Sequence, residues 1–174
     1  MADTPVRLRP VRESDLWLFE RQCTDPEAGG DFNWSGFSSA ADASRRQAQD
    51  GWLGNDDGRL IVLHDSDATG NVSWRRVTYG IPGWWCWNIG IALLPEFRGK
   101  GIGTEAQKIL VEYLFDVTSV QRIEAYTDRD NFREQRSLEK AGFLREGVIR
   151  SAQFRQGHWR DIVMYSTLRS FPTA

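Results

Sequence analysis

The feature that most constrains this chain is a glycine-rich segment, residues 98–105, between an apolar run and an amphipathic helix. The apolar run covers residues 89–94 and is typical of a buried strand. A strand, a glycine turn and a helix start place unpaired backbone N–H groups and a helix's positive end around one spot. Such a spot binds phosphate without requiring a cationic side chain. The segment therefore predicts a site for a phosphorylated ligand.

Composition excludes several classes of protein. The 174 residues, 40% of them hydrophobic, predict a single domain over residues 1–174 with one core. The net charge of −2 and dispersed Lys and Arg lack the footprint of a nucleic-acid binder. The two cysteines, Cys23 and Cys86, and the two histidines form no zinc pattern or disulfide scaffold. No apolar run approaches the ~20 residues of a membrane helix, and the start does not resemble a signal peptide. We expect a soluble, cytoplasmic protein that engages no membrane and holds no metal.

Hydrophobic periodicity predicts an α/β chain with a mixed, mostly antiparallel sheet. Strands are expected at residues 6–9, 59–64, 70–74, 84–94, 122–127, 144–154 and 159–168. Helices are expected at residues 15–21, 41–53, 104–115 and 131–140, the third opened by a capping box of Thr104 and Gln107. Residues 24–40 are predicted to be a loop. Its aromatic residues indicate either a packed surface loop or one wall of a ligand site.

Three glycine-rich patterns compete for the phosphate ligand. A Walker-type loop requires Ser or Thr after Gly99-Lys100, but Gly101 stands there, and Leu94 occupies the position of the upstream glycine. A dinucleotide fingerprint requires a third glycine where Thr104 stands. The third pattern is that of acyl-CoA binding: Arg or Gln, two residues, Gly, one residue, then Gly or Ala. Arg98, Gly101 and Gly103 fit it.

The sequence around this loop strengthens the third interpretation. The supporting stretches are Leu94-Pro95-Glu96, Gly103-Thr104-Glu105-Ala106, Arg122-Ile123-Glu124-Ala125, Asn131, Leu138-Glu139-Lys140-Ala141-Gly142-Phe143, Arg145-Glu146-Gly147 and Gly157-His158-Trp159-Arg160-Asp161. Together they resemble the GNAT superfamily of acetyltransferases. They look most like its RimJ/RimL type, whose named members acetylate the N-termini of ribosomal proteins. The resemblance covers residues 87–168, almost half of the chain.

The resemblance implies a GNAT fold of the α/β (α+β) class, with about seven strands, about four helices and two strands splayed into a V. In that fold acetyl-CoA is the co-substrate, and its pantetheine arm lies in the V. The implied cofactor contacts are Ile91, Ala92 and Leu93 for pantetheine, Gly99, Lys100, Gly101, Ile102, Gly103 and Thr104 for the pyrophosphate, and Asn131 from the other side. Arg98 and Lys100 either add charge near the phosphates or are solvated surface cations.

The catalytic groups are less clear, because acetyl transfer needs a neutral amine, a polarised carbonyl and a proton for the departing thiolate. Many relatives carry glutamate where Asn88 stands, and asparagine accepts no proton at neutral pH. Asn88 therefore either orients a water molecule or the substrate amine, or has a structural role. The tyrosine position of many superfamily members holds Leu138. A serine position of RimL-like relatives holds Glu134, which either lies near the CoA sulfur or caps a helix with Asn131.

For the acceptor site the sequence offers the loop residues Asp31, Phe32 and Trp34 and the tryptophans Trp85 and Trp87. The tryptophans could equally fill the core. We expect an N-acetyltransferase that moves an acetyl group from acetyl-CoA to a primary amine by direct attack in a ternary complex, and the resemblance implies a peptide or protein N-terminus as the acceptor. The alternatives are a small amine such as an antibiotic, a larger donor such as succinyl-CoA, and a CoA-binding module without catalysis. The oligomeric state is open, although RimL-like proteins often pair as homodimers.

Overall fold

The computed structural model describes residues 6–170 of the chain. Within them seven strands form one sheet: β1 (Val6–Pro10), β2 (Asp57–His64), β3 (Asp67–Thr78), β4 (Trp85–Leu93), β5 (Arg122–Asp128), β6 (Leu144–Arg155) and β7 (His158–Leu168). The α-helices of the same range are α1 (Leu16–Thr24), α2 (Pro26–Gly29), α3 (Ala41–Asp50), α4 (Ile102–Val117) and α5 (Phe132–Lys140). The predicted fold class is confirmed. The helix beyond the expected four is α2, which begins at a proline inside the predicted loop and is capped by Asp25.

The sheet has the strand order β1-β2-β3-β4-β5-β7-β6, and its one parallel pair among the described residues is β4 with β5. That pair is short: Trp87 lies opposite Ile123, Asn88 opposite Glu124 and Ile89 opposite Ala125. Beyond these positions β4 stays paired with β3 as far as Leu93, and β5 stays paired with β7 as far as Asp128. The two strands therefore part, which confirms the predicted V-shaped splay.

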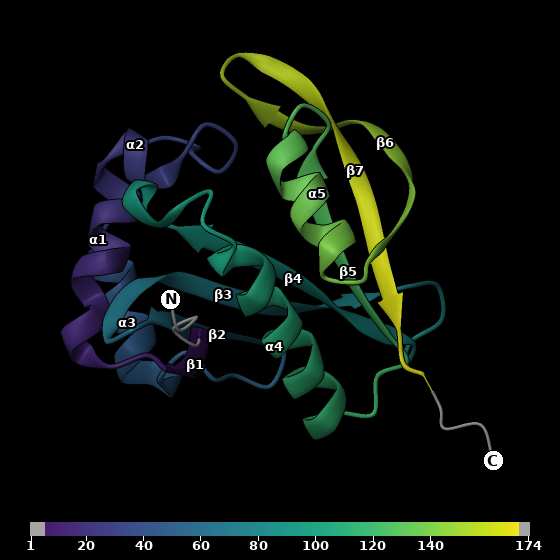
Figure 1. Ribbon diagram of the computed structural model, residues 1–174, viewed down its shortest axis with the longest axis horizontal. Coiled ribbons are helices and arrows are strands. Elements are labelled where there is room, and N and C mark those ends of the chain that lie inside the picture. The colour runs from purple at the N-terminus through teal and green to yellow at the C-terminus, as the bar shows by residue number, and fades with distance from the viewer. Residues whose placement is uncertain (1–5, 171–174) are drawn as a thin grey trace.

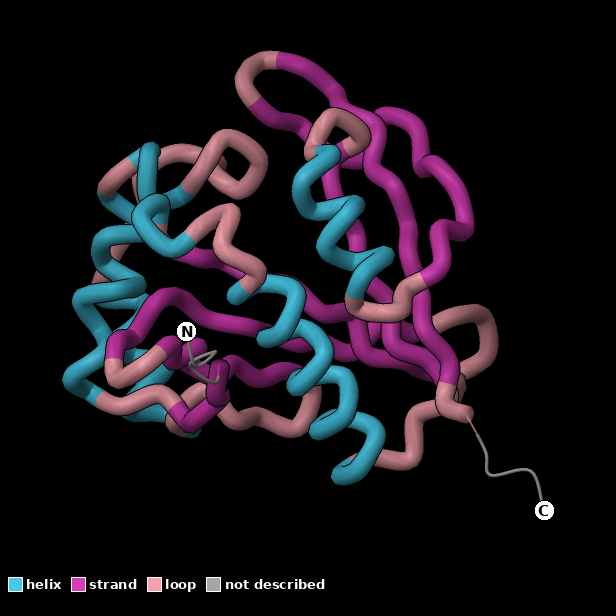
Figure 2. Tube along the Cα trace, in the orientation of Figure 1, coloured by secondary structure: helices cyan, strands magenta, loops and turns pink. Residues whose placement is uncertain are grey.

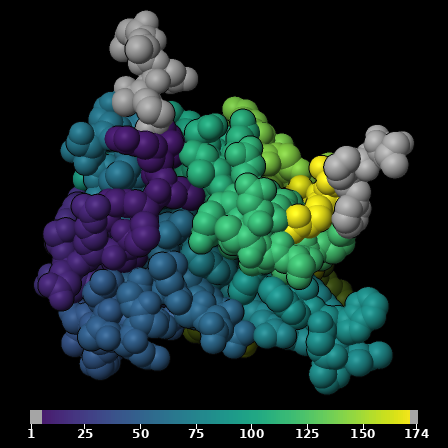
Figure 3. Space-filling view, turned by 90° about the horizontal axis from the view of Figure 1, so that it is seen from below, coloured from purple at the N-terminus to yellow at the C-terminus, as the bar shows by residue number. Residues whose placement is uncertain are grey.

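Helices cover both faces of the sheet. On one face Leu110 and Leu114 of α4 and Leu138 of α5 pack in the main core with side chains of β2–β5. On the other face Leu18 and Phe19 of α1 join a smaller core formed with α3 and β2. Figures 1 and 2 show α4 and α5 in front of the sheet, with α1–α3 gathered at one side. Seen from below, the first third of the chain forms one side of the molecule, next to green α4 (Figure 3). Among the described residues no helix is long and apolar enough to cross a membrane.

Helix α4 begins earlier than expected, and its predicted capping box is wrong. Its first residue is Ile102, and the residue before it, Gly101, adopts the left-handed φ of 81°. Thr104 and Gln107 are therefore already inside the helix. Gln107 is 1% exposed, and Thr104 shares a hydrogen bond of 2.9 Å with Ser137 of α5. Both side chains join α4 to α5 and leave the backbone N–H groups of the helix start uncapped.

The β6–β7 hairpin is fastened to the rest of the molecule by Arg155. Its guanidinium is 7% exposed, forms an ion pair with Asp128 at the end of β5, and donates to the carbonyl oxygen of Asp31 at 2.7 Å. It also lies 5.1 Å from the centre of the Phe32 ring. One arginine therefore connects the hairpin, the diverging end of β5 and the loop after α2. These three elements surround the open part of the V.

Candidate functional site

The glycine turn at the start of α4 presents a set of free backbone donors. The first backbone N–H after Arg98 that donates a hydrogen bond is that of Glu105, and its acceptor is the carbonyl oxygen of Gly101. Within residues 6–170 no acceptor pairs with the N–H groups from Gly99 to Thr104. Gly99 and Gly101 have φ of 73° and 81°, and a Cβ added at either would meet no atom within 4 Å. The turn is therefore an uncovered, glycine-shaped surface at the positive end of a 16-residue helix.

The cations of this segment have different surroundings. Arg98 donates through Nε to the carbonyl oxygen of Leu93 at 2.9 Å and through a terminal nitrogen to that of Ala28 at 2.8 Å. These bonds tie the turn to the end of β4 and to α2. Lys100 is exposed, with its ammonium 5.6 Å from the centre of the Phe97 ring. Lys100 is thus free to approach a phosphate, whereas Arg98 already stabilises the backbone around the turn.

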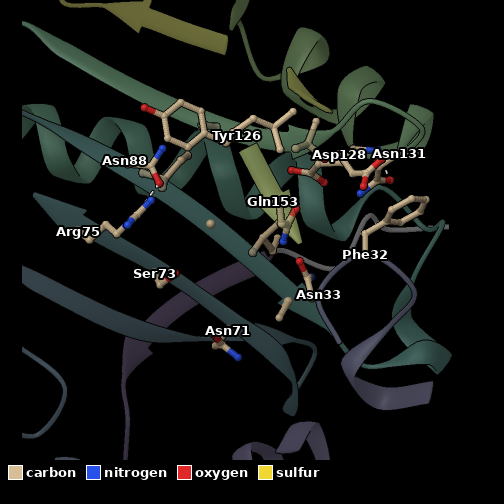
Figure 4. A pocket seen from close by; sticks show the side chains of 18 of the residues that line it. Phe32, Asn33, Asn71, Ser73, Arg75, Asn88, Tyr126, Asp128, Asn131 and Gln153 are labelled. Carbon is tan, nitrogen blue, oxygen red and sulfur yellow. Dashed lines mark hydrogen bonds between the residues drawn. The ribbon is translucent and has the colours of Figure 1, made fainter. Parts of the chain in front are cut away.

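A pocket of about 520 Å³ occupies the V between β4 and β5, a volume typical of ligand sites. Successive residues of a strand point to opposite faces. The lining includes Ile89 and Ile91, which pack toward α4, and Asn88, Gly90 and Ala92, which face the other side. The pocket therefore reaches both faces of the sheet through the gap. Figure 4 shows side chains from β3, from β5 and from the loop after α2 around it.

Asn88 lies at the apex of the V and is 7% exposed. Its Oδ1 accepts from Nε of Arg75 at 3.3 Å, and its Nδ2 donates to the carbonyl oxygen of Glu124 at 3.5 Å. Next to it Tyr126 lines the pocket, and its hydroxyl donates to the buried carboxylate of Glu124. Burial and this hydrogen bond raise the pKa of Tyr126. Asn88 and Tyr126 therefore offer neutral polar groups at the apex.

Glu134 enters the pocket from the first turn of α5. The Asn131 side chain accepts from the Glu134 N–H at 3.3 Å, which is one half of the predicted capping box. The Glu134 carboxyl does not complete the box and instead accepts from Gln107 of α4. Burial raises the pKa of Glu134 to about 7, and the hydrogen bond from Gln107 only partly offsets this. The carboxyl can therefore both donate and accept a proton near neutral pH.

The structure places the site residues predicted from sequence in several different locations. The main pocket brings together Asn88, Ile91, Ala92, Asn131, Glu134 and Phe32. The glycine turn and Leu93 lie outside its lining, and Ile102 is buried in the core beneath the turn. Trp34 lines a second, smaller pocket with Trp52. Trp85 and Trp87 pack against each other in the main core, and exposed Asp31 contributes its carbonyl to Arg155.

Several pocket residues were missed by sequence reasoning. They are Asn33, Arg59, Asn71, Ser73, Arg75, Ile89, Gly90, Ala125, Tyr126, Thr127, Asp128, Ala152, Gln153 and Ile162. Asn71, Ser73 and Arg75 follow one another in a row on one face of β3 (Figure 4). Their alternation with Val72 and Trp74 is a readable two-residue period. That pattern could have identified one polar face of the strand, although not the pocket above it.

These features define a class of protein: an α/β domain whose ligand cleft opens where two parallel strands part, with a glycine-rich helix start close by. The profile of the acetyltransferase (GNAT) domain family matches residues 6–144. The chain belongs to this family.

Individual relatives agree with this assignment. The probable N-acetyltransferase YjcK of Bacillus subtilis is 42% identical over 73 residues, which are 42% of this chain and 40% of YjcK. The putative ribosomal N-acetyltransferase YdaF of the same organism is 35% identical over 81 residues, 47% of this chain and 44% of YdaF. The chain thus matches less than half the length of either relative. The structure of spermidine N-acetyltransferase from Vibrio cholerae in complex with CoA and spermine has a TM-score of 0.78 at 18% identity, covering 94% of this chain and 95% of that one.

Proposed function

We propose that this protein transfers an acetyl group from acetyl-CoA to a primary amine within a ternary complex. The observation that carries the proposal is the combination of uncovered N–H groups at Gly99–Thr104 with a pocket that passes through the sheet. A diphosphate held by the turn leaves its attached chain next to the diverging end of β4. An amine can then approach from the opposite face of the sheet. Family membership supports the same donor.

The turn fits a diphosphate by its chemistry. Several N–H groups converge there without acceptors among residues 6–170, the helix dipole adds positive potential, and the two glycines leave space where side chains would stand. Acetyl-CoA supplies an activated acyl group as a thioester. The N–H groups of β4 that face the gap are the donors available to the pantetheine amides and to the thioester carbonyl.

The pocket residues have distinct parts in the proposed reaction. Asn88 orients the neutral amine at the apex, where it attacks the thioester carbon. The nitrogen of the tetrahedral adduct loses a proton to solvent water, and collapse of the adduct breaks the carbon–sulfur bond and releases a thiolate that takes a proton. Glu134 donates the proton to the thiolate, because its raised pKa keeps a protonated fraction near neutral pH. The acceptor we favour is a peptide N-terminus, as in the RimJ/RimL type, and the name of YdaF supports this.

Free thiol released from acetyl-CoA, followed with a colour reagent across N-terminal peptides, polyamines and aminoglycosides, tests the proposal. We expect thiol release that depends on an added amine, and a product heavier by one acetyl group. The Glu134→Gln variant should bind CoA as tightly as the wild type and turn over more slowly. Tight CoA binding without acceptor-dependent thiol release would instead identify a CoA-binding module without catalysis.

A further inference from the structure

The acceptor side of the pocket contains two arginines, one on β2 and one on β3. Arg59 on β2 and Arg75 on β3 both line it, and neither forms an ion pair with any residue in the range 6–170. Arg59 lies directly opposite Ser73 in the β2–β3 register, and Arg75 is two residues further along β3. Cross-strand and diagonal neighbours on one face are within reach of long side chains. Both side chains therefore leave one face of the sheet, and Arg59 lies where the main pocket meets the smaller pocket lined by Phe19 and Trp52.

The contacts of each arginine leave donors available. Arg75 is exposed, and its one hydrogen bond among the described residues runs from Nε to Asn88. Arg59 rests on aromatic rings, 4.8 Å from the centre of Trp52 and 5.6 Å from that of Phe19. Burial lowers the pKa of Arg59, and the opposing effect of the Asp57 carboxylate does not offset it. A cation in this situation gains from an incoming anion.

The carboxylates near the pocket are already engaged or lie elsewhere. Asp128 is held by Arg155 in a buried pair, and Glu134 lies on the side of the sheet that α4 and α5 cover. Asp57 lies opposite Arg75 in the register, but its Oδ1 accepts from Arg46 at 2.7 Å. The acceptor side is consequently positive. Like charges placed together in a site cost free energy, so this side of the pocket disfavours a polyamine.

We propose that Arg59 and Arg75 bind a carboxylate of the acceptor, so that the preferred substrate is a primary amine with a negative charge close to it. This inference rests on the proposed function and names its substrate class. Arg75 lies directly opposite Asn88, and Ser73 opposite Gly90. A carboxylate on the arginines therefore places a nearby amine over the apex of the V. Both an acidic peptide N-terminus and a free acidic amino acid carry this chemistry.

The test compares C-terminally amidated peptides that differ only at the second residue: Ala-Glu-Gly-Gly, Ala-Gln-Gly-Gly and Ala-Lys-Gly-Gly, with spermidine added. Free glutamate and its diamide form a second arm, which separates peptide from amino-acid acceptors. For the wild type we expect kcat/KM for the Glu peptide to exceed that for the Gln peptide by about tenfold or more, as for a charge-assisted hydrogen bond. Equal or better acetylation of the Lys peptide or spermidine would overturn the inference while leaving the proposed function intact.

Variants then identify the residues responsible. Arg75→Gln should bring the Glu-to-Gln ratio close to one, Arg75→Lys should keep part of it, and Arg75→Glu should favour the Lys peptide. Arg45→Gln is the matched control, because Arg45 lies on α3, is 70% exposed and pairs with Asp42 outside the main pocket. It should keep the wild-type ratio. CoA affinity, measured for each variant, reports whether it is folded. A ratio that survives Arg75→Gln in a CoA-binding variant would contradict the assignment.

A binding measurement keeps this inference separate from the proposed function. Calorimetry with CoA-saturated protein should show the Glu peptide binding more tightly than the Gln peptide, whether or not it is acetylated. Preferential binding without thiol release would remove the proposed function alone. Thiol release with equal binding and equal rates for the two peptides would remove the carboxylate assignment alone.

Discussion

At the residue scale, the most informative side chain is Glu134. It stands at the third position of α5, where a glutamate ordinarily bonds back to the cap and improves the helix start. Here the carboxyl of Glu134 instead accepts a hydrogen bond from Gln107 of the neighbouring helix α4, a side chain that is 1% exposed. The helix cap keeps only the bond from the Glu134 N–H to Asn131. The Glu134 carboxyl therefore lies in the wall of a pocket and not at a solvated helix end, and burial there raises its pKa.

This displacement predicts a specific pH dependence of stability. Burial raises the pKa of Glu134 from 4.5 to about 7. Between these values the folded protein retains a proton that the unfolded chain has released, so stability present below pH 4.5 is lost as the pH rises to about 7. The loss is at most about 3 kcal/mol by the linkage relation, and less where solvent reaches the carboxyl.

Glu134→Gln should flatten this dependence, because glutamine keeps a partner for Gln107 without titrating. The measurement is the free energy of unfolding from urea titrations at intervals between pH 4 and pH 8. We expect the variant and the wild type to differ in the slope of that free energy across the interval. Parallel curves would contradict the assignment of a raised pKa to Glu134.

At the scale of elements, the turn from β4 into α4 shows how far sequence reasoning reached. The glycines at 99, 101 and 103 predicted the turn, and at Gly99 and Gly101 the structure has the left-handed φ and the open space that glycine allows. The engagement of Arg98 by the carbonyl of Ala28, 70 residues earlier, could not be predicted. The same holds for Gln107, whose partners are on α5. Such side-chain assignments depend on how helices pack, which local patterns do not encode.

Gly101→Val should affect both CoA binding by this turn and the stability of the protein. Valine at a φ of 81° is strained, and its side chain would occupy the open space in front of the N–H groups. We expect CoA affinity to fall at least about tenfold, which corresponds to about 1.4 kcal/mol, with a strain cost of about 1–3 kcal/mol in stability. Calorimetry with CoA and urea unfolding measure the two quantities.

Gly51→Val is the matched control for strain. Gly51 ends α3 with a φ of 61°, and a Cβ added there also meets no atom within 4 Å. Its variant should lose a similar amount of stability while binding CoA as the wild type does. Equal loss of CoA affinity in both variants would mean that strain, and not the phosphate site, is being measured.

At the scale of the whole molecule, the two halves of the chain differ in how much of their structure could be predicted from sequence. Family patterns and helix periodicity lie mostly in residues 87–168, and there the strands, the glycine turn and the splay were predictable. The acceptor wall comes largely from β2, β3 and the loop after α2. Its residues are ordinary for a half-exposed sheet, and only the three-dimensional register places Arg75 opposite Asn88 and Arg59 opposite Ser73. The proposed donor site could thus be predicted from sequence, whereas the proposed acceptor site depends on how the sheet is assembled.

A ligand bound in the open V should raise the free energy of unfolding of this protein. The pairing of β4 with β5 ends at Ile89 and Ala125, so the backbone groups that face the gap beyond them can pair with a bound pantetheine arm. A ligand that binds only the folded state stabilises it by about 2.7 kcal/mol at 100 times its Kd. For a domain of this size that corresponds to a rise in Tm of about 5–10 °C.

We therefore expect CoA to raise Tm with the logarithm of its concentration, and pantetheine, which lacks the diphosphate, to do so far more weakly. Hydrogen exchange locates the effect: CoA should slow exchange at residues 90–93 of β4 and at residues 99–104 of the turn more than in β1 and β2. These two outer strands share the global stabilisation but not the contact, so they serve as the internal reference. Equal effects of CoA and pantetheine would mean that the glycine turn contributes no phosphate binding. Protection centred on α3 and β2 would place the ligand in the smaller pocket beside Trp34 and remove the cleft between β4 and β5 from the mechanism.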